Sequence, residues 1–187
     1  MRKTRINDIF IINNFIDRYE LDIIQECLSN VDWLPDEQSP NFYVNLTGHG
    51  DDEHVSDKAI RILQEKRDLL QRNIEQDFNC QVSEEGIGTI VKYHIGWTLE
   101  LHADCWNELP TYAGYPSRDI SSLVYLTDDF EGGNLFFPDL DIEIEPVAGS
   151  AIYFPGNNEH LHEVKELLSG NRATCTGFWH ILNKETK

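Results

Sequence analysis

The sequence predicts a mainly β fold, a double-stranded β-helix (jelly roll) core backed by N-terminal helices, and three observations support this prediction. Eight short apolar segments follow one another from Gly86 onward with turn residues between them, as in antiparallel barrels and sandwiches. Two segments before Cys80 instead have the apolar spacing of amphipathic helices. The 187 residues are 40% hydrophobic, which is enough for one sizeable core. We therefore expect a single domain, with a helical support layer over residues 1–80 and a β core over residues 86–182.

The N-terminal segment is expected to begin with a short strand, IFIINNF, and to continue into a helix. Asp17 is a suitable N-cap for that helix, because its carboxylate can accept hydrogen bonds from the first turn. The segment YELDIIQECLSN then places Leu21, Ile24 and Leu28 on one face.

A second helix is expected from Ser56 to about Phe78. Residues 33–53, between the two helices, contain prolines and glycines without a clean period, so we expect a loop or an irregular strand pair there. Both helices should cover one sheet. The side chains expected to be buried on the second helix are Ile60, Leu63, Leu70 and Ile74.

The C-terminal half is expected to consist of strands separated by turns, notably at Glu131–Asn134 and Pro146–Gly149. In a jelly roll, strands that are distant in sequence meet inside the mouth of the barrel, so residues far apart along the chain can share one site. The expected strands are GTIVKYHI, TLELHAD, ISSLVYL, NLFFP, DIEIE, AIYFP, EHLHEV and ATCTGFWHIL.

His102 and Asp104 form the first part of a candidate metal site. Successive side chains of a strand alternate between its faces, so these two residues point the same way and Ala103 points away. With His162 far downstream, they supply two imidazoles and one carboxylate. Such a set on one face of an ion leaves the opposite face open, as in non-haem Fe(II) oxygenases.

Arg172 is the candidate for binding a carboxylate beside this metal. The segment Ser-Gly-Asn before it is expected to be a turn, after which Arg172 opens an apolar strand that returns beside the ligand strand. A guanidinium group binds carboxylates through two parallel hydrogen bonds. The arrangement would hold an oxo-acid cosubstrate next to the metal.

Together these residues make the chain resemble the 2-oxoglutarate and Fe(II)-dependent dioxygenases, and within them the prolyl 4-hydroxylase-like branch. The matching stretch runs from about Gly86 to Trp179. It comprises VKYHIGWTLELHAD, RDISSLVYLTDDFEGGNLFFP, EPVAGSAIYFPGNNEHLHEV, SGNR and GFW. The resemblance implies that His102, Asp104 and His162 are the catalytic iron ligands. It also implies that Arg172 and the hydroxyl group of Tyr93 bind the far carboxylate of 2-oxoglutarate.

The resemblance further implies an oxidoreductase that hydroxylates an unactivated C–H bond with Fe(II), 2-oxoglutarate and O2, releasing succinate and CO2. Ascorbate is a candidate additional cofactor. A prolyl residue of a peptide or protein is the leading substrate, and a free amino acid or small metabolite is the alternative. Two further alternatives are a non-redox metal-binding cupin-like barrel and a binding module, neither of which needs Arg172. The oligomeric state is left open.

Two of these residues have alternative interpretations. His160 lies two positions before His162, so a strand would place both on one face, and the family register favours His162. If His162 is the ligand, His160 lines the pocket or supports a ligand. Tyr93 lies on an apolar strand, where an aromatic side chain can serve only for packing.

The segment CWNELPTYAGYPS, between Asp104 and Arg118, is a candidate lid over the substrate. Its aromatic side chains Trp106, Tyr112 and Tyr115 could exclude water from the reaction. The alternative is a surface loop that is packed by its own rings.

A net charge of −18 argues against nucleic acid as a partner, because phosphate binding needs basic patches. The charge permits a basic peptide substrate, although an acidic surface also serves solubility alone. We expect no membrane span, since no apolar run approaches about 20 residues. The N-terminus lacks the features of a signal peptide, and the four cysteines show no paired spacing. These features predict a cytoplasmic location.

Overall fold

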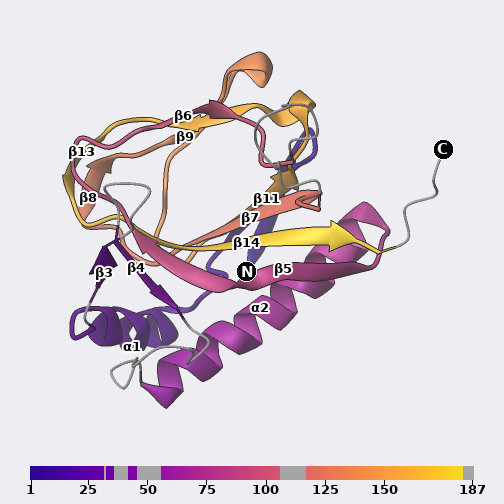
Figure 1. Ribbon diagram of the computed structural model, residues 1–187. Helices are drawn as coiled ribbons and strands as arrows, with labels where there is room; N and C mark the ends of the chain where they lie inside the picture. Colours follow the sequence, from indigo (N-terminus) through magenta and orange to yellow (C-terminus); the bar gives the residue numbers. More distant parts are fainter. Residues whose placement is uncertain (32, 36–41, 46–55, 106–116, 183–187) are drawn as a thin grey trace.

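Two antiparallel sheets face one another, and two helices cover the outer face of the larger sheet (Figure 1). The computed structural model describes residues 1–31, 33–35, 42–45, 56–105 and 117–182. The helices are α1 (Arg18–Leu28) and α2 (Asp57–Phe78), with the short 3₁₀ helices η1 (Pro138–Leu140) and η2 (Asn158–His160). The expected jelly roll with N-terminal helices is confirmed.

Within the described residues, the large sheet has eight strands and the smaller sheet has four. In spatial order, the large sheet contains β1 (Arg2–Ile6), β2 (Ile9–Asn13), β11 (Ala151–Pro155), β7 (Ile120–Tyr125), β14 (Ala173–Ile181), β5 (Val82–Lys92), β4 (Phe42–Asn45) and β3 (Leu34–Pro35). The smaller sheet contains β10 (Ile142–Ile144), β9 (Leu135–Phe137), β12 (His162–Val164) and β6 (Leu99–His102). A third pair is formed by β13 (Leu167–Gly170) and β8 (Phe130–Gly132).

The central strands of the large sheet are buried on both faces, and the alternation of their side chains assigns residues to two separate cores. On β11, Ile152 and Phe154 point into the space between the two sheets. Tyr153, between them, points instead toward the helices. Because both sets are apolar, AIYFP is a continuous apolar run rather than an alternating one.

The first helix begins where the sequence indicated. The side chain of Asp17 accepts a hydrogen bond from the backbone of Glu20, and the Glu20 carboxylate accepts one from the backbone of Asp17, which forms a capping box. The predicted face of this helix is buried, together with Cys27.

The second helix, α2, crosses the back of the large sheet, and Ser56 caps its N-terminus. Leu63, Leu70 and Ile74 are buried as predicted, whereas Ile60 is only partly buried and Ala59 takes the buried position. Near its C-terminal end, Asp77 pairs with Lys3 and accepts a hydrogen bond from the hydroxyl group of Tyr153. No helix in the described parts of the chain is long and apolar enough to cross a membrane.

Several predicted elements differ from the structure. The predicted short strand IFIINNF is present as β2, but an additional strand, β1, precedes it, and both extend the large sheet beside β11. The turn expected at Ser169–Asn171 is shorter, since β13 continues to Gly170. The segment EHLHEV begins as η2, and only its last three residues form a strand.

Candidate functional site

The candidate metal site lies at the end of β6, where this strand pairs with β12. His102 and His162 are direct partners across these antiparallel strands, with ring centroids 4.4 Å apart. The strand predicted to reach Asp104 ends at His102, and Asp104 lies in a bend just beyond it. Pairing of the two strands, rather than alternation along one strand, therefore brings the three side chains together.

The three side chains direct their ligand atoms at one point. Nε2 of His102 lies 3.5 Å from Oδ1 of Asp104, and Nε2 of His162 lies 3.4 Å from Oδ2 of the same carboxylate. One ligand atom from each residue lies within 4.8 Å of the others. This spacing allows all three to bind one divalent ion with bonds of about 2.0–2.2 Å.

Backbone carbonyl groups fix the orientation of both imidazoles. Nδ1 of His102 lies 2.7 Å from the carbonyl oxygen of Glu100, and Nδ1 of His162 lies 3.0 Å from that of His160. A carbonyl oxygen can only accept, so each Nδ1 carries a proton and donates it. Each Nε2 is then left as the metal-binding nitrogen.

The protonation states of this cluster suit a metal site. Burial would raise the pKa of Asp104, but the two histidines and Ser121 hold it below its ordinary value. Burial lowers the pKa of His162. Burial would also lower the pKa of His102, yet the neighbouring Asp104 raises it above the ordinary value. Metal binding must therefore displace a proton from His102 more than from His162.

The cluster contains His162 and not His160. His160 belongs to η2, where its Nδ1 lies 2.8 Å from Oδ1 of Asn157, and its side chain is buried. Its backbone carbonyl group is the acceptor for His162. This arrangement agrees with the supporting role that the sequence left open for His160.

Arg172 precedes β14, and its side chain is fully buried. The strand that it opens was expected beside the ligand strand, but β14 lies between β5 and β7 in the opposite sheet. The backbone of Arg172 is held by a hydrogen bond from the amide of Tyr93 to its carbonyl oxygen. The ligand set and the arginine therefore come from facing sheets.

The guanidinium group of Arg172 is only partly satisfied. Its Nε donates to the carbonyl oxygen of Gly133 at 3.1 Å, while Nη1 and Nη2 are buried and have no hydrogen-bond partner in the described parts of the chain. Gly133 permits this approach, because it has φ +66° and a Cβ there would lie 2.7 Å from Cδ of Arg172. Two unpaired donors on a buried cation are costly unless an anion completes the site.

Two tyrosine rings enclose this guanidinium group. Its central carbon lies 4.3 Å from the ring centroid of Tyr93 and 5.4 Å from that of Tyr125. The hydroxyl group of Tyr125 is also buried and has no well-aligned hydrogen bond to the described residues. Burial raises the pKa of Tyr125, and the adjacent Arg172 opposes this rise. The hydroxyl group of Tyr93 already lies 3.5 Å from Oγ1 of Thr174. Tyr125, which the sequence did not single out, therefore adds a third unpaired donor.

One cavity between the sheets is lined by the metal cluster and Tyr93 together. Its other walls are mainly apolar and include Leu135, Phe154 and Phe178. The guanidinium group of Arg118 stacks on the ring of Phe178 at 3.7 Å, beside the cluster. The candidate lid residues Trp106, Tyr112 and Tyr115 lie outside the described residues, so their role stays a prediction.

Comparison with known families gives a match to the 2OG-Fe(II) oxygenase superfamily over residues 88–180. Among curated proteins, human prolyl 3-hydroxylase 2 is 36% identical over 85 residues, which cover 43% of this chain and 11% of the human protein. Prolyl 3-hydroxylase 2 of Gallus gallus is 30% identical over 130 residues, covering 67% of this chain and 16% of that protein. The chain thus spans only a small part of these relatives.

Two solved structures show the same fold. A prolyl hydroxylase from Trichoplax adhaerens, in complex with a hypoxia inducible factor peptide fragment, superposes with a TM-score of 0.70 at 20% identity over 94% of this chain and 84% of that one. A viral collagen prolyl hydroxylase from Paramecium Bursaria Chlorella virus-1 gives a TM-score of 0.67 at 17% identity, covering 94% and 97% of the two chains.

Proposed function

Because the chain belongs to the 2OG-Fe(II) oxygenase superfamily, we propose that it is a dioxygenase that uses Fe(II), 2-oxoglutarate and O2 to hydroxylate an unactivated C–H bond. The products released with the hydroxylated substrate are succinate and CO2. His102, Asp104 and His162 hold the iron, and Arg172 and Tyr93 bind the far carboxylate of 2-oxoglutarate.

The observation that carries this proposal is the buried Arg172, whose Nη1 and Nη2 have no hydrogen-bond partner among the described residues. Its guanidinium group lies against the rings of Tyr93 and Tyr125, and Tyr93 also lines the cavity of the metal cluster. A carboxylate would satisfy both nitrogen atoms and the hydroxyl group of Tyr125. A non-redox metal barrel has no use for such an arginine, so the observation favours the dioxygenase.

Bound iron and 2-oxoglutarate supply the oxidising power, and the protein supplies position and surroundings. His102, Asp104 and His162 would hold the ion, and the ion would supply positions for the cosubstrate and O2. The apolar walls Leu135, Phe154 and Phe178 limit the access of water to this space. The hydrogen bonds from Nδ1 of His102 and His162 hold both rings with Nε2 directed at the metal position.

A prolyl residue in a peptide or protein is the proposed substrate. The curated relatives named above are prolyl 3-hydroxylases, and one structural neighbour was solved with a peptide fragment. Arg118 lies at the edge of the cavity, stacked on Phe178, where a guanidinium group can donate to the carbonyl oxygens of a bound peptide. A free amino acid or small metabolite is the alternative.

We further propose a cytoplasmic location and no nucleic-acid or membrane partner, in keeping with the net charge of −18. Ascorbate would serve only to keep the iron reduced, so its effect should be on sustained turnover rather than on the first one.

The first experiment is anaerobic titration of metal-stripped protein with Fe(II) and 2-oxoglutarate, read by the weak visible charge-transfer band of the chelate. We expect the band in the wild type and not in Asp104→Ala, which removes the bridging carboxylate. Asp139→Ala is the matched control, because it removes an exposed acidic side chain away from the cluster and should keep the band.

Loss of the band in both variants, or its absence in the wild type, would contradict the proposal and favour a metal barrel of another kind. If the band forms, Pro-containing peptides and free proline are compared for succinate release and for a gain of one oxygen atom. Turnover of free proline alone would overturn the peptide substrate, and the position of the new hydroxyl group separates 3- from 4-hydroxylation.

A further inference from the structure

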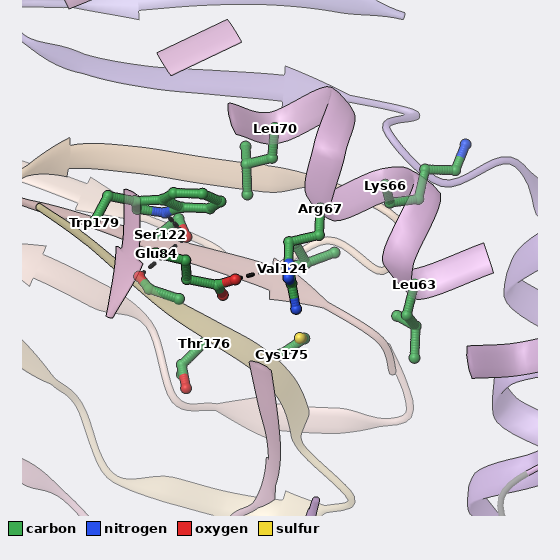
Figure 2. Close-up of a pocket in the computed structure, with 11 residues that line it drawn as sticks. Leu63, Lys66, Arg67, Leu70, Glu84, Ser122, Val124, Cys175, Thr176 and Trp179 are labelled. Atoms are coloured by element: carbon green, nitrogen blue, oxygen red, sulfur yellow. Dashed lines mark hydrogen bonds and ion pairs between the residues drawn. The ribbon is translucent and has the colours of Figure 1, made fainter. Parts of the chain in front are cut away.

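A second cavity lies on the opposite face of the large sheet, between this sheet and α2 (Figure 2). Leu63, Leu70 and Trp179 form apolar walls, and Glu84 on β5 points into the space among them. The cavity has a volume of about 20 Å³, which is room for about one water molecule. It is too small for an organic ligand, so the chemistry of its own side chains decides what it can do.

Glu84 is the unusual group in this cavity, because its side chain is only 10% exposed. Its Oε2 lies 2.7 Å from Nε of Arg67 on α2, yet it has no aligned hydrogen bond among the described residues. Arg67 reaches the carboxylate from the rim, and its own side chain is 42% exposed. One half-exposed cation is thus the main compensation for a buried negative charge.

Gly177 makes room for this carboxylate. A Cβ at Gly177 would lie 2.8 Å from Oγ of Ser122 and 3.4 Å from Oε1 of Glu84. That hydroxyl oxygen accepts a hydrogen bond from Nε1 of Trp179 and donates to the carbonyl oxygen of Gly177. The indole N–H of Trp179 and the hydroxyl group of Ser122 therefore donate to Ser122 and Gly177 rather than to Glu84.

The other titratable groups around Glu84 do not replace Arg67. Asp68 on α2 opposes ionisation of Glu84 by its negative charge. Lys66 also lines the cavity, but it pairs with Glu20 at 2.5 Å. Burial raises the pKa of the Cys175 thiol on β14 to about 12, so this group stays neutral.

We infer that Glu84 and Arg67 form a proton-controlled contact between α2 and the large sheet. With the carboxyl group ionised, Arg67 is held across the cavity and contributes to the seating of α2. With the carboxyl group protonated, Arg67 is released to solvent and the contact becomes neutral.

The direction of the pH effect follows from burial, the largest influence, which raises the pKa of Glu84 from 4.5 to about 7, against the opposing charge of Arg67. Between these two pH values the folded protein keeps a proton that the unfolded chain has released. The free energy of unfolding therefore decreases as pH rises from about 4.5 to about 7, and this contribution is constant at higher pH.

The contact between Glu84 and Arg67 lies on the other side of the large sheet from the candidate metal site. Ser122 and Thr176 line both cavities, because only the backbone layer of β7 and β14 separates them. Ser121, the neighbour of Ser122, points to the other side and influences Asp104. The inference itself concerns the seating of α2 and does not depend on the proposed enzymatic activity.

The test is thermal unfolding of the 187-residue chain at pH 5 and pH 8. Glu84→Gln keeps the shape of the side chain and removes the buried charge. We expect it to raise Tm by about 5 °C relative to wild type at pH 8 and by much less at pH 5. Glu65→Gln, on the exposed side of α2, removes the same charge and should produce no such pH-dependent gain.

Arg67→Met provides the second variant. It should lower Tm at pH 8, where Glu84 is ionised, and leave Tm nearly unchanged at pH 5. When Arg67→Met is combined with Glu84→Gln, the change in Tm caused by Arg67→Met should be the same at pH 5 and at pH 8. Amide hydrogen exchange of residues 63–70, corrected for intrinsic rates, should be faster in Arg67→Met than in wild type at pH 8 and nearly unchanged at pH 5.

An increase in Tm for Glu84→Gln that is equal at pH 5 and pH 8 would overturn the inference. A decrease in Tm for Arg67→Met that does not depend on pH would also overturn it. The gain would also have to exceed that of Glu65→Gln, because a general relief of the net negative charge affects both variants alike.

Discussion

Arg172 and Glu84 are two buried charged side chains on opposite faces of the large sheet, and their surroundings differ in kind. Glu84 has an oppositely charged partner, Arg67, and can also take up a proton. Arg172 has no ion-pair partner among the described residues, and its guanidinium group is enclosed by the rings of Tyr93 and Tyr125.

This difference distinguishes a buried charge that belongs to the fold from a buried charge that is available to bind a ligand. A buried charge with a partner from the same chain is part of the fold, and its partner offsets part of the cost of burial within the molecule. A buried charge with unpaired donors and no neutral form is stable only at a cost to the fold, which a bound anion can offset. The following predictions test this distinction in order of the expected effect.

The largest effect is expected from Arg172→Met. Each hydrogen bond to a charged group contributes about 1.5–3 kcal/mol, so loss of two should weaken 2-oxoglutarate binding about 100-fold or more. The Tm of the cofactor-free protein should change little, because a buried charge with unpaired donors disappears. Anaerobic calorimetric titration and thermal unfolding measure the two quantities.

Arg67→Met is the matched control, since it removes an arginine from the other face and should leave 2-oxoglutarate affinity unchanged. If Arg172→Met unfolded the protein while binding by the remaining folded fraction stayed normal, Arg172 would be a structural charge after all.

The two tyrosines around Arg172 should differ in effect. Tyr125→Phe removes a buried hydroxyl group without a partner, and we expect about a tenfold loss of 2-oxoglutarate affinity. Tyr93→Phe should cost less, because its hydroxyl group already lies near Oγ1 of Thr174. Equal affinity for Tyr93→Phe and wild type would refute the assignment of Tyr93 to the cofactor carboxylate.

The smallest effect is expected on the helix side. Gly177→Ala should lower the free energy of unfolding by about 1 kcal/mol, because its Cβ displaces the hydroxyl group of Ser122 from its hydrogen bonds. Denaturant unfolding of Gly177→Ala, Ser122→Ala and the double variant gives a double-mutant cycle, which measures the coupling between the two positions. Additive effects of the two changes would show that the close approach does not matter.

The candidate site could be found from the sequence because its residues lie in short patterns. His102 and Asp104 are two positions apart, and the segment after His162 leads to Arg172 in a recognisable register. The structure brings the first three together and places Arg172 in the facing sheet. The residues that surround Arg172 were harder to predict from the sequence. Tyr125 lies in an ordinary apolar strand, and only its unpaired hydroxyl group in the structure distinguishes it.

The ends of strands were predicted less well where hydrogen bonds between neighbouring strands, rather than the residue pattern along the chain, determine where a strand stops. The strand of His102 ends two residues before Asp104, and the segment of His160 forms a 3₁₀ turn, because partners in β12 and β6 fix the register there. Both changes alter which residues share a face.

The sequence by itself determined the jelly-roll class, the two capped helices, the two-histidine and one-carboxylate set, and the arginine, because each depends on local spacing and residue chemistry. Only the tertiary structure decided that Arg172 leads into the sheet opposite the two ligand histidines, and that its Nη1 and Nη2 are unpaired among the described residues. It also decided that Glu84 meets Arg67 on the helix side of that sheet. These features depend on which strands become neighbours, and burial and partnership of a charge exist only once the sheets and α2 have packed.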